Sequence, residues 1–176
     1  MRAPARHALD ARFAEPHRQS YTPPPQPSAS SGDSIALRSA DASETARRIA
    51  LAMVHALLEA DAAALQRLFA ERVVFGLEAI GRPRAELVDR CIEETRSLAY
   101  EPDLSPEQVV DVRAIEVQRA DRFHAQVPLP PGLRPSDLLV TLPPRNTGTE
   151  ARSRVPCVTA VYVRAGERSA IVGLTR

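Results

Sequence analysis

The sequence predicts an α+β domain in which three helices come first and a run of strands follows. Between about residue 43 and residue 96, apolar residues recur every three or four positions. Beyond residue 96 the spacing changes, and short segments rich in β-branched residues follow one another up to residue 176. Helices followed by strands are typical of an α+β fold with its helices on one face of a mainly antiparallel sheet. We therefore expect one domain over residues 43–176.

The first 42 residues are expected to form a disordered tail rich in Pro and Ser. They contain TPPPQPS from Thr22 to Ser28, followed by a polar stretch of Ala, Ser, Gly and Asp. Proline removes backbone donors and the polar stretch offers little apolar surface, so no core can form here. We interpret the tail as a flexible leader or as the product of a misassigned start codon. A docking peptide that uses Leu9, Phe13 and Tyr21 is the alternative.

Two helices are predicted at the start of the domain. The first should begin at Asp41 or Ser43, either of which can cap it, and its apolar face runs over residues 49–60. Asp61 follows directly and should cap the second helix, residues 62–70.

A short strand and a third helix come next. Residues 72–75 read as a strand that ends at Gly76. Pro83 suits the first turn of a helix over residues 84–96.

The second half of the chain is expected to form the rest of the sheet. Residues 122–127 alternate strictly, which predicts that Phe123, Ala125 and Val127 pack on the helices while His124 points away. A Gly-containing connection at residues 165–168 predicts a closing hairpin. The expected strands are residues 109–118, 122–127, 137–142, 155–164 and 169–174.

The two cysteines, Cys91 and Cys157, are expected to be buried thiols. They lie in different predicted elements among apolar residues, and neither has a partner at metal-ligand spacing. A disulfide between them is the alternative.

Composition excludes several classes of function. The chain has 23 basic and 22 acidic residues, and its arginines are scattered, so it lacks the basic patch of a nucleic-acid-binding protein. No apolar stretch is long enough to cross a membrane, and the N-terminus lacks the apolar core of a secretory signal. No phosphate-binding glycine loop or metal motif is found, so we expect no cofactor and no metal. The default expectation is a cytoplasmic protein.

Four segments occur in the order typical of one superfamily: ALLEADAAAL (56–65), LFAERVVF (68–75), GRPRAEL (81–87) and YVRAGERSAIV (162–172). They resemble the first two helices, the entry to the first strand, the start of the third helix and the final strand pair of the nuclear-transport-factor-2-like superfamily. This superfamily includes SnoaL-like and ketosteroid-isomerase-like domains.

The resemblance implies a cone-shaped α+β barrel, in which three helices pack on a bent, mainly antiparallel sheet around an apolar cavity. It also implies a homodimer through the outer face of the sheet. The superfamily contains isomerases, dehydratases and cyclases as well as members without known activity, so the fold alone does not set the function.

This sequence lacks the catalytic residues of the superfamily at the matching positions. Ketosteroid-isomerase-like members place a general base at the end of the first strand, where this sequence has Leu77, which cannot take up a proton. Glu78, one residue away, is a candidate that needs a bulge to face the cavity. His124 and Asp111 are the other candidate acid–base residues, because an imidazole titrates near neutrality. For each of the three, an ordinary surface or ion-pair role is the alternative.

Three further residues are candidates for a ligand pocket. His55 stands where some members place a polar pocket residue, and Phe75 and Tyr162 lie in predicted strands. We expect the domain to bind a small hydrophobic molecule without evident catalysis.

Two alternatives to this function stay open. One is an isomerase, cyclase or dehydratase that acts by acid–base proton transfer on a hydrophobic carbonyl or polycyclic substrate. The other is a non-catalytic dimerising module with a Pro-rich tethering tail. An inward-facing His124 would favour the enzyme.

Overall fold

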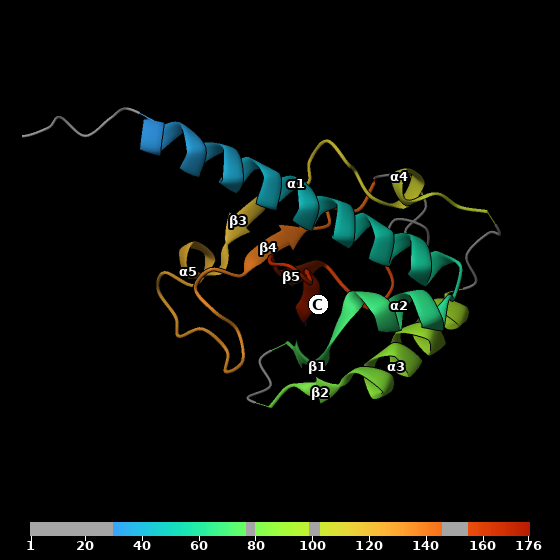
Figure 1. Cartoon of the computed structure of the whole chain (residues 1–176). Helices are drawn as coiled ribbons and strands as arrows, with labels where there is room; N and C mark the ends of the chain where they lie inside the picture. The colour runs from blue at the N-terminus through green and yellow to red at the C-terminus, as the bar shows by residue number, and fades with distance from the viewer. Residues whose placement is uncertain (1–29, 77–79, 99–102, 146–154) are drawn as a thin grey trace, which may run out of the picture.

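The α+β architecture is confirmed by a computed structural model (Figure 1). It describes residues 30–76, 80–98, 103–145 and 155–176, with only the backbone described for residues 30–39. The helices are α1 (Ser30–Leu58), α2 (Ala62–Leu68), α3 (Arg84–Ser97), α4 (Pro106–Val109) and α5 (Ala120–Phe123). The strands are β1 (Phe69–Phe75), β2 (Arg82–Pro83), β3 (Val117–Arg119), β4 (Leu138–Thr141), β5 (Ala160–Arg164) and β6 (Ala170–Thr175).

The three main helices follow the prediction closely, apart from the start of α1. This helix begins at Ser30, earlier than Asp41 or Ser43. Its end is set by Ala60, whose φ of 53° lies in the left-handed region and closes the turn. Asp61 then caps α2 as predicted, because its Oδ1 accepts a hydrogen bond of 2.9 Å from the backbone N of Ala64.

The six strands form one sheet in the order β2-β1-β6-β5-β4-β3. β1 runs parallel to β6, and every other neighbouring pair is antiparallel. The sheet is neither closed nor strongly curled, so the predicted cone-shaped barrel is wrong. Its two edge strands, β2 with two residues and β3 with three, do not pair with each other, so the sheet stays open.

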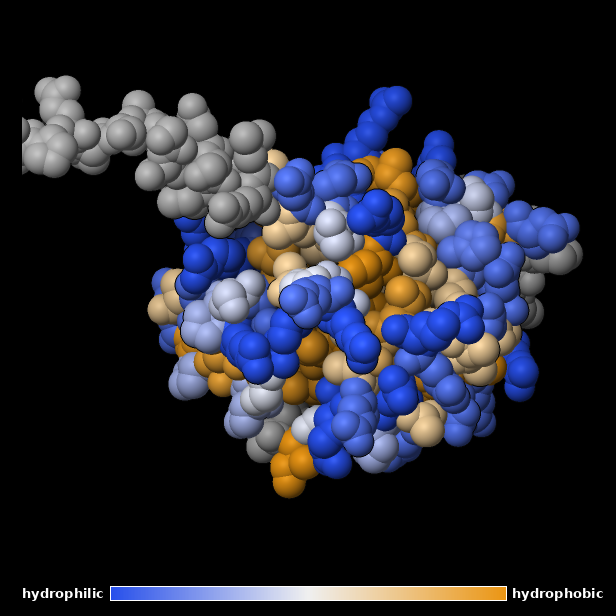
Figure 2. All heavy atoms as spheres, in the orientation of Figure 1, coloured by the Kyte–Doolittle hydropathy of each residue, from blue (hydrophilic) through white to orange (hydrophobic). Residues whose placement is uncertain are grey.

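The main core fills the space between the helices and one face of the sheet. In Figure 1, α1 crosses this face while α2 and α3 lie beside β1. Hydrophilic side chains cover most of the surface on this side, with apolar side chains visible between them (Figure 2). Large aliphatic side chains are fully buried where the apolar cone was expected: Met53, Leu57, Leu65, Leu87, Ile171 and Leu174.

The opposite face of the sheet is covered by the short helix α5 and by the connection that follows it. Residues 124–137, here called the covering loop, run from the end of α5 to the start of β4. Leu129 and Leu133 of this loop pack against a small second cluster that includes Tyr162 and Val172. This face therefore has a thin cover, and it carries the candidate site described below.

Two of the predicted strands are wrong. Residues 109–118 contain the end of α4, a turn and the start of β3. Residues 122–127 contain the end of α5 and a turn, in which the backbone N of His124 donates to Ala120 O at 2.9 Å. The residues expected to pack on the helices do not, since Phe123 is 51% exposed and Val127 57%. The period-two spacing is therefore not evidence of a strand here, because this face of the segment is not buried.

The expectation of buried thiols is also wrong, because Cys91 and Cys157 form a disulfide. Cys91 lies on α3 and Cys157 lies just before β5, with a Cα–Cα distance of 5.3 Å. Cys157 adopts a φ of 67°, in the left-handed region that L-residues rarely occupy. The two residues are 66 positions apart, and the packing of α3 against the sheet brings them together. The sequence alone does not indicate this contact.

Candidate functional site

A pocket of about 220 Å³ lies on the face of the sheet under the covering loop. It is called the His–Tyr pocket here, and its described lining is Gly76, Phe123, His124, Pro130, Tyr162, Thr175 and Arg176. These residues come from the ends of β1 and β6, the middle of β5, α5 and the covering loop.

The polar centre of the pocket is a hydrogen bond of 2.7 Å between His124 Nε2 and Tyr162 Oη. His124 directly follows α5, while Tyr162 is buried in the middle of β5. The ring of Phe123 meets the imidazole edge-on, with ring centroids 5.0 Å apart. His124 thus lies on the face of the sheet away from the helices, where it faces this pocket and not open solvent.

The hydrogen-bonding pattern favours one tautomer of His124. Its Nδ1 is buried and has no hydrogen-bond partner among the described residues. A proton there would be a buried donor without an acceptor, and such donors are rarer in folded proteins than unpaired acceptors. We therefore assign the proton to Nε2, which donates to Tyr162 Oη. The hydroxyl of Tyr162 keeps its own proton and can donate it to a ligand.

Burial raises the pKa of Tyr162, because it removes water from the charged phenolate. The phenol is therefore neutral at physiological pH and acts as a hydrogen-bond donor.

Gly173 sets the position of the Tyr162 ring. The two residues are partners across β5 and β6. A Cβ added at Gly173 would lie 2.8 Å from Tyr162 Cδ2 and 3.1 Å from Leu133 Cδ2. The ring therefore lies against bare backbone, and Leu133 of the covering loop closes over the same place.

An ion pair fastens the covering loop to the sheet. The carboxylate of Asp137 is 1% exposed and accepts hydrogen bonds from Arg164 Nε at 2.9 Å and Nη2 at 2.8 Å. It also accepts one from the backbone N of Arg134 at 2.8 Å, while Arg164 Nη2 donates to Gly132 O at 3.0 Å. The bond to Asp137 raises the pKa of Arg164. We call this pair of Asp137 and Arg164 the clamp. It joins β5 to the part of the covering loop between Gly132 and Asp137.

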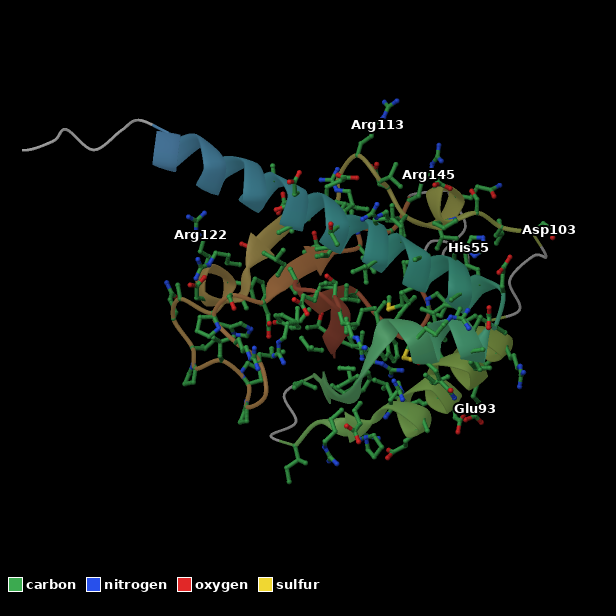
Figure 3. All side chains as sticks on the ribbon, in the orientation of Figure 1. His55, Glu93, Asp103, Arg113, Arg122 and Arg145 are labelled. Carbon is green, nitrogen blue, oxygen red and sulfur yellow. A yellow bond between two sulfur atoms is a disulfide. The ribbon has the colours of Figure 1, made fainter. Side chains whose placement is uncertain are left out.

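The other predicted pocket residues lie elsewhere. His55 is exposed on the last turn of α1 (Figure 3), with its Nδ1 3.2 Å from Glu59 Oε2. Phe75 belongs to the main core, and the guanidinium groups of Arg82, Arg90 and Arg176 lie 5.7, 4.8 and 5.5 Å from its ring centroid. Of the three predicted pocket residues, Tyr162 alone lines the His–Tyr pocket.

Two of the predicted catalytic residues, His124 and Asp111, are not brought together. Asp111 lines a different hollow of about 440 Å³ together with Arg113 and Arg145, whose side chains extend outward beside α4 (Figure 3). Its Oδ1 accepts a hydrogen bond of 3.1 Å from the backbone N of Arg113. Glu78 lies outside the described residues.

Several residues of the site are not predicted as functional from the sequence. Gly173 interrupts a strand of β-branched residues, and such a glycine often marks a close approach of another group to the backbone. The sequence predicts Asp137 only as the start of a strand and Arg164 only as the end of one. Their pairing has no signal in the sequence.

Among the described residues, no group of three or more His, Cys, Asp or Glu side chains is placed to hold a metal ion. No helix within the same ranges is both long and apolar enough to cross a membrane. Comparisons with protein-family models, with curated proteins and with solved structures find no match to this chain.

Proposed function

We propose that the protein binds a small, mainly apolar molecule in the His–Tyr pocket, with the polar end of that molecule at Tyr162 Oη. The observation that carries the proposal is the bond between His124 and Tyr162 inside a hollow that Phe123 and Pro130 line as well. Mostly apolar walls with a few convergent polar groups are typical of ligand sites. Sites for drug-sized molecules enclose roughly 300–1,000 Å³, so a pocket of about 220 Å³ suits a smaller ligand.

The polar pair defines the chemical class of the ligand. A neutral Tyr162 whose oxygen already accepts from His124 offers one O–H donor to the pocket. Its natural partner is a carbonyl or other uncharged oxygen acceptor. The body of the ligand would pack against the Phe123 ring, which is half exposed without it.

We also propose a distant relationship to the nuclear-transport-factor-2-like superfamily. Three N-terminal helices, a sheet that follows them and a closing hairpin support it. The open sheet and the position of the pocket on the face away from the helices depart from the arrangement that the resemblance implied.

The binding proposal is tested by titrating the full chain with cyclohexanone and following the imidazole proton signals of His124 by NMR. We expect these signals to shift in the wild type. Tyr162→Phe keeps the ring but removes the donor, and should weaken binding about three- to tenfold, the equivalent of one hydrogen bond. His55→Gln is the matched control, since His55 is exposed on α1, and should bind like the wild type. Equal affinity in Tyr162→Phe would refute the proposed role of its hydroxyl.

A second candidate function is an enzyme that transfers protons on a hydrophobic carbonyl substrate. The contact of His124 with Tyr162 inside a pocket favours it, because a histidine in contact with solvent alone would not be positioned to act on a bound substrate. We place it second because the described lining of the pocket contains no carboxylate to share the acid–base work with His124. In D₂O, an enzyme of this kind would exchange the α-protons of cyclohexanone faster than buffer does, and His124→Gln would remove the effect. Simple binding predicts exchange at the buffer rate.

A further inference from the structure

A second hollow of about 360 Å³ lies on the same face of the sheet, on the other side of the covering loop. Its floor consists of Ala70 and Val74 from β1 and Val172 from β6. Ile80 and Gly81 border it on one side, and Pro131 and Gly132 of the covering loop border it on the other. It shares no described lining residue with the His–Tyr pocket.

Backbone rather than side chains forms part of the wall of this hollow. Gly132 adopts a φ of 95°, and a Cβ there would lie 3.2 Å from Val74 Cγ2. The covering loop can therefore run close to the floor. Ile80 is 73% exposed, so the opposite wall presents an apolar side chain that nothing else in the described chain covers.

Two arginines, Arg72 and Arg164, line the hollow, and it is called the arginine groove here. The charge of Arg164 is balanced by the buried carboxylate of Asp137. Arg72 is exposed, and its side chain makes no hydrogen bond or ion pair with any other residue in the described ranges. An unpaired guanidinium beside an apolar floor is suited to a ligand with an anionic end and an apolar body.

We propose that the arginine groove binds a carboxylate with an aliphatic chain. The carboxylate pairs with the guanidinium of Arg72, which presents parallel N–H donors that match the two oxygens. The chain lies on Ala70, Val74 and Val172 and covers Ile80. Charge complementarity and the apolar floor together select an amphiphile over a free inorganic anion or a neutral hydrocarbon.

The test is isothermal titration calorimetry of the full chain with octanoate, and with 1-octanol as the uncharged analogue. Arg72→Gln keeps most of the side-chain length and removes the charge. We expect it to weaken octanoate binding about tenfold, within the range of one charge-assisted hydrogen bond, and to leave octanol binding unchanged. Arg113→Gln is the matched control, because Arg113 lines another hollow, and should bind octanoate like the wild type.

Several outcomes would overturn the proposal. One is equal octanoate affinity in the wild type and Arg72→Gln, with circular dichroism showing both folded. Another is a loss of octanoate binding in Tyr162→Phe, which would move the ligand to the His–Tyr pocket. A third is a dimer that Arg72→Gln dissociates in sedimentation experiments while octanoate gives no heat, since a second copy would then occupy the groove. Failure of cyclohexanone to bind at His124 leaves this test unaffected, because the two sites share no described residue.

Discussion

At the scale of single residues, the phenol of Tyr162 makes the folded state sensitive to alkaline pH. Burial raises its pKa above the ordinary value of 10.0. As the pH rises past about 10, the unfolded chain loses this proton before the folded chain does. The stability that depends on the neutral phenol is therefore complete below that pH and is lost as the pH rises through the pKa of the folded state.

We expect near-ultraviolet absorbance to show one tyrosine that titrates above the others in the folded protein. Tyr162→Phe should remove that late transition and flatten the fall in stability above about pH 10. The chain has three tyrosines, so the difference between wild type and variant assigns the signal. A late transition that persists in the variant would show that another tyrosine causes it.

Gly173 provides a second prediction at this scale. Gly173→Ala places a methyl group against the ring of Tyr162 and should destabilise the domain by about 1–3 kcal/mol, the usual cost of overpacking. Urea unfolding measures the loss, and the NMR signals of His124 should shift as Tyr162 moves. Gly166→Ala is the matched control, because no atom lies within 4 Å of the added methyl group. Similar losses of stability in both variants would mean that Gly173→Ala destabilises the domain through the conformational freedom of the backbone, and not through the contact with Tyr162.

At the scale of elements, the covering loop depends on the pair formed by Asp137 and Arg164. Asp137→Asn keeps the shape of the side chain but removes the charge that Arg164 and the backbone of Arg134 bind. Because Asp137 is buried and Arg164 is 30% exposed, we expect a loss of about 2 kcal/mol, less than for a fully buried pair. Hydrogen exchange should also speed up in residues 124–137.

Asp121→Asn is the control for the clamp. It breaks the pair between Arg119 and Asp121, whose side chains are 52% and 38% exposed. Exposed pairs contribute little, so the loss should stay within about 0.5 kcal/mol. If both variants lose the same amount, the clamp has no special role in holding the loop.

The elements differ in how far the sequence predicts them. α2, α3 and the hairpin of β5 and β6 are coded locally, by the cap at Asp61, by helical spacing and by the Gly-containing turn, and all three were predicted. The structure of residues 109–127 was not predicted, because the spacing of their apolar residues fits a strand as well as it fits short helices and turns. Contacts with β4 decide which of these structures forms. The amino-acid composition of a segment does not show whether its structure is set locally or by tertiary contacts.

The His–Tyr pocket shows the same limit. The sequence indicates both His124 and Tyr162 as candidate residues, but it contains no signal that pairs two side chains 38 positions apart. Their contact depends on the end of α5, on the register of β5 against β6 and on the small size of Gly173. Each of these is a tertiary feature, so the sequence predicts the participants and not the site.

At the scale of the whole molecule, the open sheet changes where partners can bind. The expected homodimer through the outer sheet face remains a prediction, as does the tethering role of the Pro-rich tail. That face carries both hollows and the exposed Ile80 and Phe123, so a second copy there would cover them. Sedimentation velocity with and without octanoate tests this, and we expect ligand and second copy to compete.

The disulfide between α3 and the segment before β5 links the helical layer to the sheet. It joins residues 66 positions apart, and closing a loop of that length should stabilise the fold by about 2–4 kcal/mol. We expect Cys157→Ala to lower the urea midpoint accordingly, and thiol titration of the unfolded, unreduced wild type to find no free thiol. Disulfides persist in oxidising compartments and are rare in the cytosol, so the cytoplasmic location stays a prediction that protein taken from cells would test. Two free thiols in that protein would mean a reduced chain, and its stability should then match that of Cys157→Ala.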